Sequence, residues 1–318
     1  MWLITSFVLY ILSFLAIWLG AGFIIKSVDR IARQLRLSSF ALSFFVLGLL
    51  TSIPETALGI NAVLDRKPEI FVGTLLGGTV VIFLFIIPVL AILGKGVKLN
   101  HNLDTRNLLG LLAVLSAPGL MVLDNKVSSF EGLFLVLSYG VIFYFIQRKH
   151  GVLEEHHSEA LLTKVYSFKD LAKVIFGMGL VFVSSQYIVS QTLAFAQLLN
   201  ISVFYISLIV LSLGTNLPEL SLAIRAVVSG KKDIAFGDYL GSAAANTLLL
   251  GIFTIASEGE VLTFDSFAIT FLFIVSGLGL FYFFSQTKKD ISRKEGFILL
   301  MVYLLFIIYE ISRGLLFD

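Results

Sequence analysis

The stretch from Thr51 to Gly78 reads TSIPETALGINAVLDRKPEIFVGTLLGG. It returns 164 residues later, from Thr215 to Ser242, as TNLPELSLAIRAVVSGKKDIAFGDYLGS. The two copies align without a gap and are identical at 12 of 28 positions. The same register holds upstream, where LRLS at 35–38 lies over LNIS at 199–202. Self-similarity at a fixed offset indicates a duplicated structural unit, so we interpret the chain as two related halves.

The composition is that of a membrane protein. The chain has 318 residues, of which 58% are hydrophobic and 14% are charged, whereas about 25% of the residues of a soluble domain are charged. It has no cysteine, which excludes disulfides and thiol chemistry. The first apolar run carries no basic segment before it, so we expect a first membrane span there and not a cleavable signal peptide.

Apolar runs of about 20 residues predict membrane-spanning helices. The ten predicted spans are 5–25, 40–64, 69–93, 106–123, 128–146, 170–192, 202–228, 234–256, 264–285 and 295–313. Of the 23 Lys and Arg residues, 19 lie in or beside the odd-numbered loops. Basic residues at span ends mark the cytoplasmic side, so we expect a multi-pass protein of the cytoplasmic membrane with both termini outside.

The two copies are predicted to have opposite orientations in the membrane. The first begins in span 2 and the second in span 7, so an odd number of spans separates them. Inverted repeats of this kind are common in secondary transporters. The fold class predicted is therefore an all-α membrane protein with ten transmembrane helices in two five-helix inverted-topology repeats. Residues 1–147 form the first half, with its repeat at about 44–93; residues 148–169 form a cytoplasmic connecting loop; residues 170–318 form the second half, with its repeat at about 208–256.

Each copy carries a proline followed directly by a glutamate in the middle of an apolar span, at Pro54–Glu55 and Pro218–Glu219. Proline removes a backbone hydrogen bond, which leaves carbonyl groups free around Thr51 and Thr215. A carboxylate at this depth costs at least ~2.5–3.5 kcal/mol. One such glutamate is readily explained by a structural hydrogen bond, but two at matched positions favour a shared cation site.

The expected ligands are all oxygen atoms, from the two carboxylates, backbone carbonyls and nearby hydroxyls. Such a set suits hard cations, and Ca2+ accepts 6–8 oxygens in flexible geometry. Two carboxylates neutralise one divalent ion, or they hold monovalent ions or protons instead. A site that fills in either way but does not stay as two bare anions couples two fluxes, which is antiport. The glycines of the two repeats are interpreted first as helix-packing positions.

These motifs resemble the calcium/cation antiporter superfamily, in particular the sodium/calcium exchanger membrane region of the short prokaryotic type. That family carries two alpha repeats of the form G-[TN]-[STN]-x-P-E, followed by D-[IL]-A-x-G-[ND]-x-x-G-S-N. The second copy matches with GTNLPE at Gly214–Glu219, DIAFGDYLGS at Asp233–Ser242, and Asn246, although Ala243 replaces the usual asparagine. The first copy departs further, because Leu50 replaces a glycine and because Gly78 and Ile82 replace polar residues.

The resemblance implies roles for individual residues. Glu55 and Glu219 would be the principal Ca2+ carboxylates, and Thr51 and Thr215 would supply backbone carbonyls. The supporting residues implied are Gly48, Ser52, Ser212 and Asn216, which would line the site, and Ser242 and Asn246, which would serve the coupling ion. The family also implies that spans 1 and 6 slide as the moving pair. We expect the polar groups lost from the first copy to reduce the oxygens available to Na+.

The predicted function is exchange of Ca2+ for Na+ by alternating access around a two-glutamate midplane site. The alternative is an antiporter of the same fold coupled to H+ or to other divalent or monovalent cations. A carrier of metabolites or lipids would need a larger polar cavity. An intramembrane enzyme would need a nucleophile or a metal triad, and there is no cysteine, no intramembrane histidine and no HExxH motif. We therefore expect no enzyme activity and no cofactor beyond the transported ions. The expected partners are inorganic cations and the lipid bilayer, with no nucleic acid and no obligate protein partner.

Overall fold

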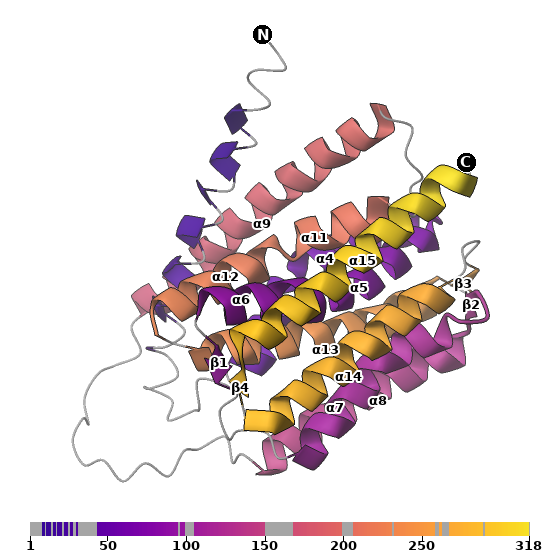
Figure 1. Ribbon diagram of the computed structural model, residues 1–318. Helices are drawn as coiled ribbons and strands as arrows, with labels where there is room; N and C mark the ends of the chain where they lie inside the picture. Colours follow the sequence, from indigo (N-terminus) through magenta and orange to yellow (C-terminus); the bar gives the residue numbers. More distant parts are fainter. Residues whose placement is uncertain are drawn as a thin grey trace.

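The structure is a computed structural model. It describes residues 43–94, 96–98, 105–149, 168–198, 206–230, 232–257, 261–262, 267–288 and 290–317, with scattered residues between 8 and 30. Residues 150–167 of the predicted connecting loop lie outside these ranges. The described chain is a bundle of helices with two short strand pairs (Figure 1).

The helices follow one another in two similar series. The first series is the π-helical turn η1 (Ser43–Leu47), α3 (Gly48–Thr51), α4 (Ile53–Leu64), α5 (Pro68–Val81), the π-helical turn η2 (Ile82–Ile86), α6 (Ile87–Leu93), α7 (Thr105–Met121) and α8 (Ser129–Lys149). The second series is α9 (Phe168–Leu198), the π-helical turn η3 (Ile206–Leu211), α11 (Ser212–Thr215), α12 (Leu217–Val228), α13 (Lys232–Ala256), α14 (Ala268–Lys288) and α15 (Arg293–Phe317).

Within the described residues, four helices are long and apolar enough to cross a membrane: Pro68–Leu93, Ala235–Ala256, Ala268–Gln286 and Arg293–Ser312. Ser43–Thr51 and Ile53–Leu64 meet at an angle of 45° and make a fifth if they are one broken span. The protein is therefore an integral membrane protein with an all-helical fold. The count of ten spans stays a prediction.

The offset of 164 residues found in the sequence also relates the elements. It carries both ends of α3 onto those of α11, and both ends of α4 onto those of α12. It carries the first residue of α5 onto that of α13, and the first residue of α8 onto that of α15. The duplication thus extends well beyond the matched motif, into helices whose sequences no longer look alike.

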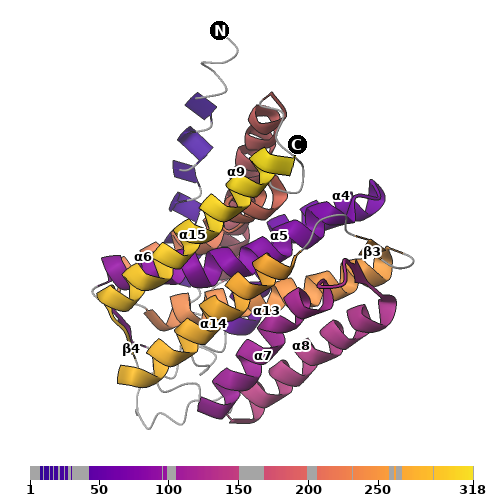
Figure 2. The same ribbon diagram turned by 45° about the vertical axis from the view of Figure 1, so that its right-hand side comes forward.

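Two antiparallel strand pairs join the halves. β1 (Val97–Lys98) pairs with β4 (Asp290–Ile291), and β2 (Lys126–Val127) pairs with β3 (Val261–Leu262). The pairs lie at opposite ends of the bundle (Figures 1 and 2). Adding 164 takes β1 to β3 and β2 to β4, so the correspondence between the halves exchanges the two ends.

The helices that follow β2 and β4 begin with the same pair of hydrogen-bonded residues, a serine and a glutamate. The Glu131 carboxylate accepts a hydrogen bond from the Ser128 backbone N–H at 2.8 Å, and Glu295 does the same for Ser292 at 2.7 Å. Each serine hydroxyl in turn accepts from the glutamate N–H at 3.4 Å. These are capping boxes, which satisfy backbone donors at a helix N-terminus. They account for the matched starts of α8 and α15.

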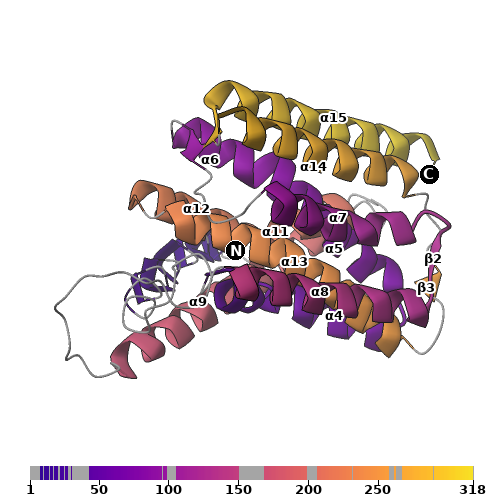
Figure 3. The same cartoon turned by 90° about the horizontal axis from the view of Figure 1, so that it is seen from below.

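The centre of the bundle is formed by α5 and α13. In the span that contains α5, 83% of the most apolar stretch is buried inside the protein, and in α13 the buried share is 78%. The corresponding shares are only 39% for α14 and 28% for α15. Large apolar side chains such as Leu305 and Ile308 stay exposed on α15, as expected of helices at the lipid boundary. Seen from below, α14 and α15 form one flank of the molecule, with α13 between them and α9 (Figure 3).

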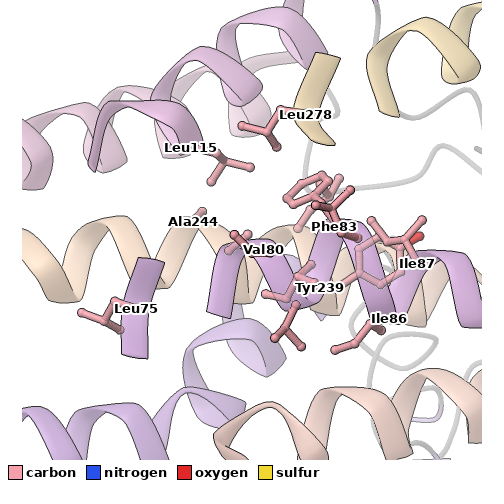
Figure 4. Packing of buried hydrophobic residues seen from close by; sticks show 14 of the residues in the cluster. Leu75, Val80, Phe83, Ile86, Ile87, Leu115, Tyr239, Ala244 and Leu278 are labelled. Atoms are coloured by element: carbon pink, nitrogen blue, oxygen red, sulfur yellow. The ribbon is translucent and has the colours of Figure 1, made fainter. Parts of the chain in front are cut away.

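Apolar side chains of both halves pack together in this centre (Figure 4). Leu75 and Val80 of α5 and Tyr239 of α13 are all buried. Phe83 of η2 meets Phe281 of α14 edge to face, with ring centroids 5.1 Å apart. The core therefore crosses the boundary between the two halves, and neither repeat buries its apolar surface alone.

Glycines let the broken helices touch the central ones. A methyl group placed on Gly77 would lie 2.2 Å from the Leu208 carbonyl oxygen, and one on Gly241 would lie 2.2 Å from that of Phe44. The two contacts are related by the 164-residue offset, so the prediction that these glycines are packing positions is confirmed. Backbone against backbone is the closest approach two helices can make.

Candidate cation site

Two helix breaks position the predicted glutamates. Ser52 separates α3 from α4 and Asn216 separates α11 from α12. A proline lies in the first turn of each following helix, where its missing N–H leaves no hydrogen bond unmade. Glu55 and Glu219 occupy the same first turns, and the positive end of a helix dipole favours a carboxylate there. The breaks that the prolines predict are therefore present.

The two carboxylates come together inside the protein. Glu55 is 2% exposed and Glu219 is 1% exposed, and they lie near enough to repel each other. The hydroxyl of Thr215 lies beside Glu55, and the hydroxyl of Thr51 lies beside Glu219. Each threonine thus lies next to the glutamate of the other repeat, so the two halves meet at this point.

Part of this acidic pair has no partner. Among the described residues, one oxygen of Glu55 and one of Glu219 are buried without a hydrogen bond. Buried polar atoms are nearly always paired, and a buried charge needs a counter-charge. Two neighbouring carboxylates that each have such an oxygen have the chemistry of a site for a positively charged ligand.

A chain of hydroxyls continues from the pair toward α13. The Thr51 and Ser242 hydroxyl oxygens are 2.8 Å apart, and Ser242 donates to Glu219 Oε1 at 3.2 Å. Thr51 also contacts Asp238 Oδ1 at 3.3 Å, with the hydroxyl as donor. Ser242 and Thr51 were both expected at the site, and the structure brings them into direct contact.

Asp238 was not among the predicted site residues, although its side chain is 0% exposed. The available signal was an acid within the apolar run AFGDYLGS, one helical turn before Ser242. Its counterpart 164 residues earlier is Thr74, so Asp238 is not one of the polar residues that the two copies share.

Amide groups of the second repeat lie beside Gly78 of the first. A Cβ atom on Gly78 would lie 2.8 Å from Asn246 Nδ2 and 3.1 Å from Asn216 Nδ2. Both amides belong to the second repeat, and both side chains are buried. A serine at position 78, as in the family pattern, would require these amide groups to shift. The first copy has lost its own oxygens, but amide groups from the second copy occupy the space.

The other expected residues lie in the helix segments that precede the two breaks. The Gly48 carbonyl oxygen accepts from the Ser52 hydroxyl at 2.8 Å and from Thr51 at 3.3 Å. The Ser212 hydroxyl donates to the carbonyl oxygens of Leu208 and Ile209. The Asn216 amide donates to the Ser212 carbonyl at 2.7 Å. These side chains therefore stabilise the broken backbone beside the glutamates.

The acidic residues do not form a single tight cluster. Within the part of the chain that the structure describes, no three His, Cys, Asp or Glu side chains converge closely enough to hold one metal ion. Any single cation here would be held by at most two carboxylates, with hydroxyl, amide or carbonyl oxygens completing its coordination. That donor set is the one hard cations prefer.

A membrane fold of duplicated broken helices that bury paired carboxylates is the architecture of a secondary ion transporter. Comparison with known proteins places the chain among the antiporters. The family model described as "Sodium/calcium exchanger protein" matches residues 5–147 and 170–312. This covers more than half of the chain, and the chain belongs to the sodium/calcium exchanger family.

Several relatives are similar over nearly their whole length. The sodium/calcium exchanger MaX1 of Methanosarcina acetivorans is 24% identical over 345 residues, covering 95% of this chain and 97% of that protein. CaxA of Alkalimonas amylolytica, whose name assigns it provisionally to the antiporters, is 28% identical over 301 residues, covering 91% and 93%. Structures of the sodium-calcium exchanger NCX_Mj are similar in fold, with a TM-score of 0.79 and 21% identity in one, covering 96% of this chain and 98% of that one.

Proposed function

We propose that the protein exchanges Ca2+ for Na+ across the membrane by alternating access around Glu55 and Glu219. The observation that carries this proposal is a buried site shared by both repeats: Glu55 and Glu219 are buried together, and Thr51 of the first repeat contacts Ser242 of the second at 2.8 Å. A cation held between the two carboxylates would contact both halves at once. Ion binding is then linked to the arrangement of both halves, as exchange requires.

The charge of the pair supports Ca2+ as one of the ions. Two carboxylates balance one divalent cation, and the remaining nearby ligands are neutral oxygens. Ca2+ tolerates such an irregular set, whereas Mg2+ prefers to keep several of its waters. Na+ is proposed as the coupling ion because hydroxyl and carbonyl oxygens extend beyond the pair, at Thr51, Ser242 and Gly48.

H+ is the competing coupling ion. The buried oxygens of Glu55 and Glu219 that lack partners would also be satisfied by protons. The first copy supplies no hydroxyl at Gly78 and no polar group at Ile82, which leaves fewer ligands for monovalent metal ions. This alternative is separated from Na+ coupling by the transport assay below.

The inverted arrangement of the halves is part of the proposal. It is supported by the odd number of predicted spans between the copies and by the way the 164-residue offset exchanges the strand pairs at the two ends. The termini are proposed to lie outside, as the distribution of basic residues indicates. In this arrangement each half would open the site to one side of the membrane.

Span 1 and α9 are proposed as the moving pair. Their backbones touch at glycines, because a methyl group on Gly20 would lie 2.7 Å from the Gly177 carbonyl oxygen. Arg30 and Asp170 join the same two segments by an ion pair of 3.1 Å. Close packing and an ion pair would let them move as a unit. A cross-link from span 1 to a static helix that left exchange intact would contradict this assignment.

The decisive assay is uptake of 45Ca2+ into proteoliposomes loaded with Na+, repeated with a pH gradient and no Na+. Uptake that requires internal Na+ would support the proposal. Uptake driven by the proton gradient alone would establish the alternative coupling. No uptake under either gradient would refute Ca2+ exchange.

Replacement of the two glutamates tests the site itself. Glu55→Gln and Glu219→Gln should each abolish exchange without preventing membrane insertion, because a neutral amide is less costly to bury than a carboxylate. Glu310→Gln is the matched control: Glu310 is also 0% exposed, but it is on α15 and accepts a hydrogen bond from Thr270 of α14 at 3.0 Å. Transport at the wild-type rate by either site variant would rule out the assignment.

A further inference from the structure

The two central helices carry different chemistry on corresponding faces. On α13, an acid, a hydroxyl and an amide follow one another at four-residue spacing: Asp238, Ser242 and Asn246. Residues four apart lie on the same face of a helix. The corresponding residues of the first half are Thr74, Gly78 and Ile82. The duplicated backbone therefore presents a polar stripe in one half and a nearly apolar stripe in the other.

The polar stripe takes part in a group of oxygens drawn from three helix segments. Thr51 Oγ1 lies 3.3 Å from Asp238 Oδ1, 2.8 Å from Ser242 Oγ and 3.3 Å from the Gly48 carbonyl oxygen. Ser242 Oγ lies 3.2 Å from Glu219 Oε1. The segments η1, α3 and α12 all pack against α13 here, and this packing holds the oxygen atoms in place.

The symmetry-related group in the other half is much poorer. Among the described residues, the Thr215 hydroxyl donates one hydrogen bond, to the Ser212 carbonyl oxygen, and its length of 3.5 Å is at the limit for a hydrogen bond. At the Asp238 position stands Thr74, whose hydroxyl is buried without a partner among the described residues. At the Ser242 position, Gly78 has no side chain. The carboxylate is thus present in one half-site only.

Asp238 also has an unsatisfied atom of its own. Its Oδ2 oxygen is buried and makes no hydrogen bond within the described chain. Asp238 lies close enough to Glu219 for the two carboxylates to repel each other, yet it does not join both glutamates around one ion. A buried, half-paired carboxylate beside another acid calls for a cation of its own.

We propose that Asp238 is a third carboxylate of the transport site and that, with Thr51 and Ser242, it forms a separate subsite for a monovalent coupling cation. This inference rests on the proposed function and deepens it. One carboxylate with neutral oxygens balances a single positive charge, so the subsite suits Na+ better than Ca2+. In the Ca2+-loaded state, the divalent ion lies between Glu55 and Glu219.

Equilibrium binding of 22Na+ and 45Ca2+ to the purified full-length protein in detergent tests the subsite without requiring transport. The variant is Asp238→Asn, which keeps the shape and removes the charge. A hydrogen-bonded charge contributes about 1.5–3 kcal/mol, so Na+ affinity should fall at least about tenfold. Ca2+ affinity should change much less, and retained Ca2+ binding shows that the variant is folded. The control Thr74→Val, at the corresponding position of α5, should bind both ions like the wild type.

The outcomes are distinct. Unchanged Na+ binding by Asp238→Asn would overturn the inference and leave the proposed exchange standing. An equal loss of Na+ and Ca2+ affinity would also overturn it, because Asp238 would then belong to the Ca2+ site. If the wild type binds Ca2+ but not Na+, the subsite and Na+ coupling both fail. If the wild type binds neither ion, the proposed function fails with them.

Discussion

Gly241→Ala should damage the site by separating two helices. The new methyl group would lie 2.2 Å from the Phe44 carbonyl oxygen, and ordinary contact begins near 3.4 Å. The backbones must therefore part by about 1.2 Å. The Thr51 and Ser242 hydroxyls span the same crossing at 2.8 Å, so a shift along that line would leave them about 4.0 Å apart, beyond hydrogen-bonding range. Overpacking of this kind costs about 1–3 kcal/mol, and a displacement of about 1 Å in a site can lower a rate ~100-fold.

Two measurements check this prediction: thermal unfolding of the purified variant in detergent, and Na+-dependent 45Ca2+ uptake in proteoliposomes. Gly279→Ala of α14 is the control, because a methyl group there would meet nothing within 4 Å. It should leave transport unchanged and, if anything, strengthen its helix by up to ~1 kcal/mol. Wild-type stability and transport in Gly241→Ala would show that the helices do not cross as closely as described, and the coupling of packing to the site would be refuted.

Two further predictions concern stability. Asp170→Asn removes the 3.1 Å ion pair with Arg30. Because Asp170 is buried but Arg30 is half exposed, the free energy of unfolding should fall by only about 1 kcal/mol. The loss should shrink at high salt, which thermal unfolding at two ionic strengths would show. Glu295→Ala removes the capping box with Ser292 and should lower unfolding stability by about 0.3–1.5 kcal/mol. Glu131→Ala should have an effect of the same size in the same assay, and a large inequality would contradict the equivalence of the two capping boxes.

Much of the fold could be predicted from the sequence, because the duplication is visible there as a constant offset. The prolines indicated broken helices, and the structure has breaks at Ser52 and Asn216, two residues before each proline. The reason for that spacing is that proline fits the first turn of a new helix better than the end of an old one. The strand pairs β1–β4 and β2–β3 could not be foreseen, since each joins two residues from one half to two from the other and carries no periodic signal.

The site was predicted in part. The matched motif identified Glu55 and Glu219, and the structure places them together. The motif does not indicate that each threonine lies beside the glutamate of the other repeat, because a repeat compared with itself suggests that each motif serves its own half. It also missed how Asn216 and Asn246 fill the space at Gly78. That space is defined by helices from both repeats, and only their packing reveals it.

The mismatch between the halves is as informative as their likeness. Duplication preserves where helices begin, break and cross, so equivalent positions stay equivalent in space even after the side chains diverge. Divergence along the stripe of Asp238, Ser242 and Asn246 therefore changes the side chains that face the candidate site without moving their backbone positions. When Ca2+ has left Glu55 and Glu219, the charge of Asp238 adds to theirs in one buried region, and a buried uncompensated carboxylate costs several kcal/mol. An ion of the opposite sign at that position would offset the cost, which is the physical reason for expecting a monovalent cation in this half of the site and not in the other.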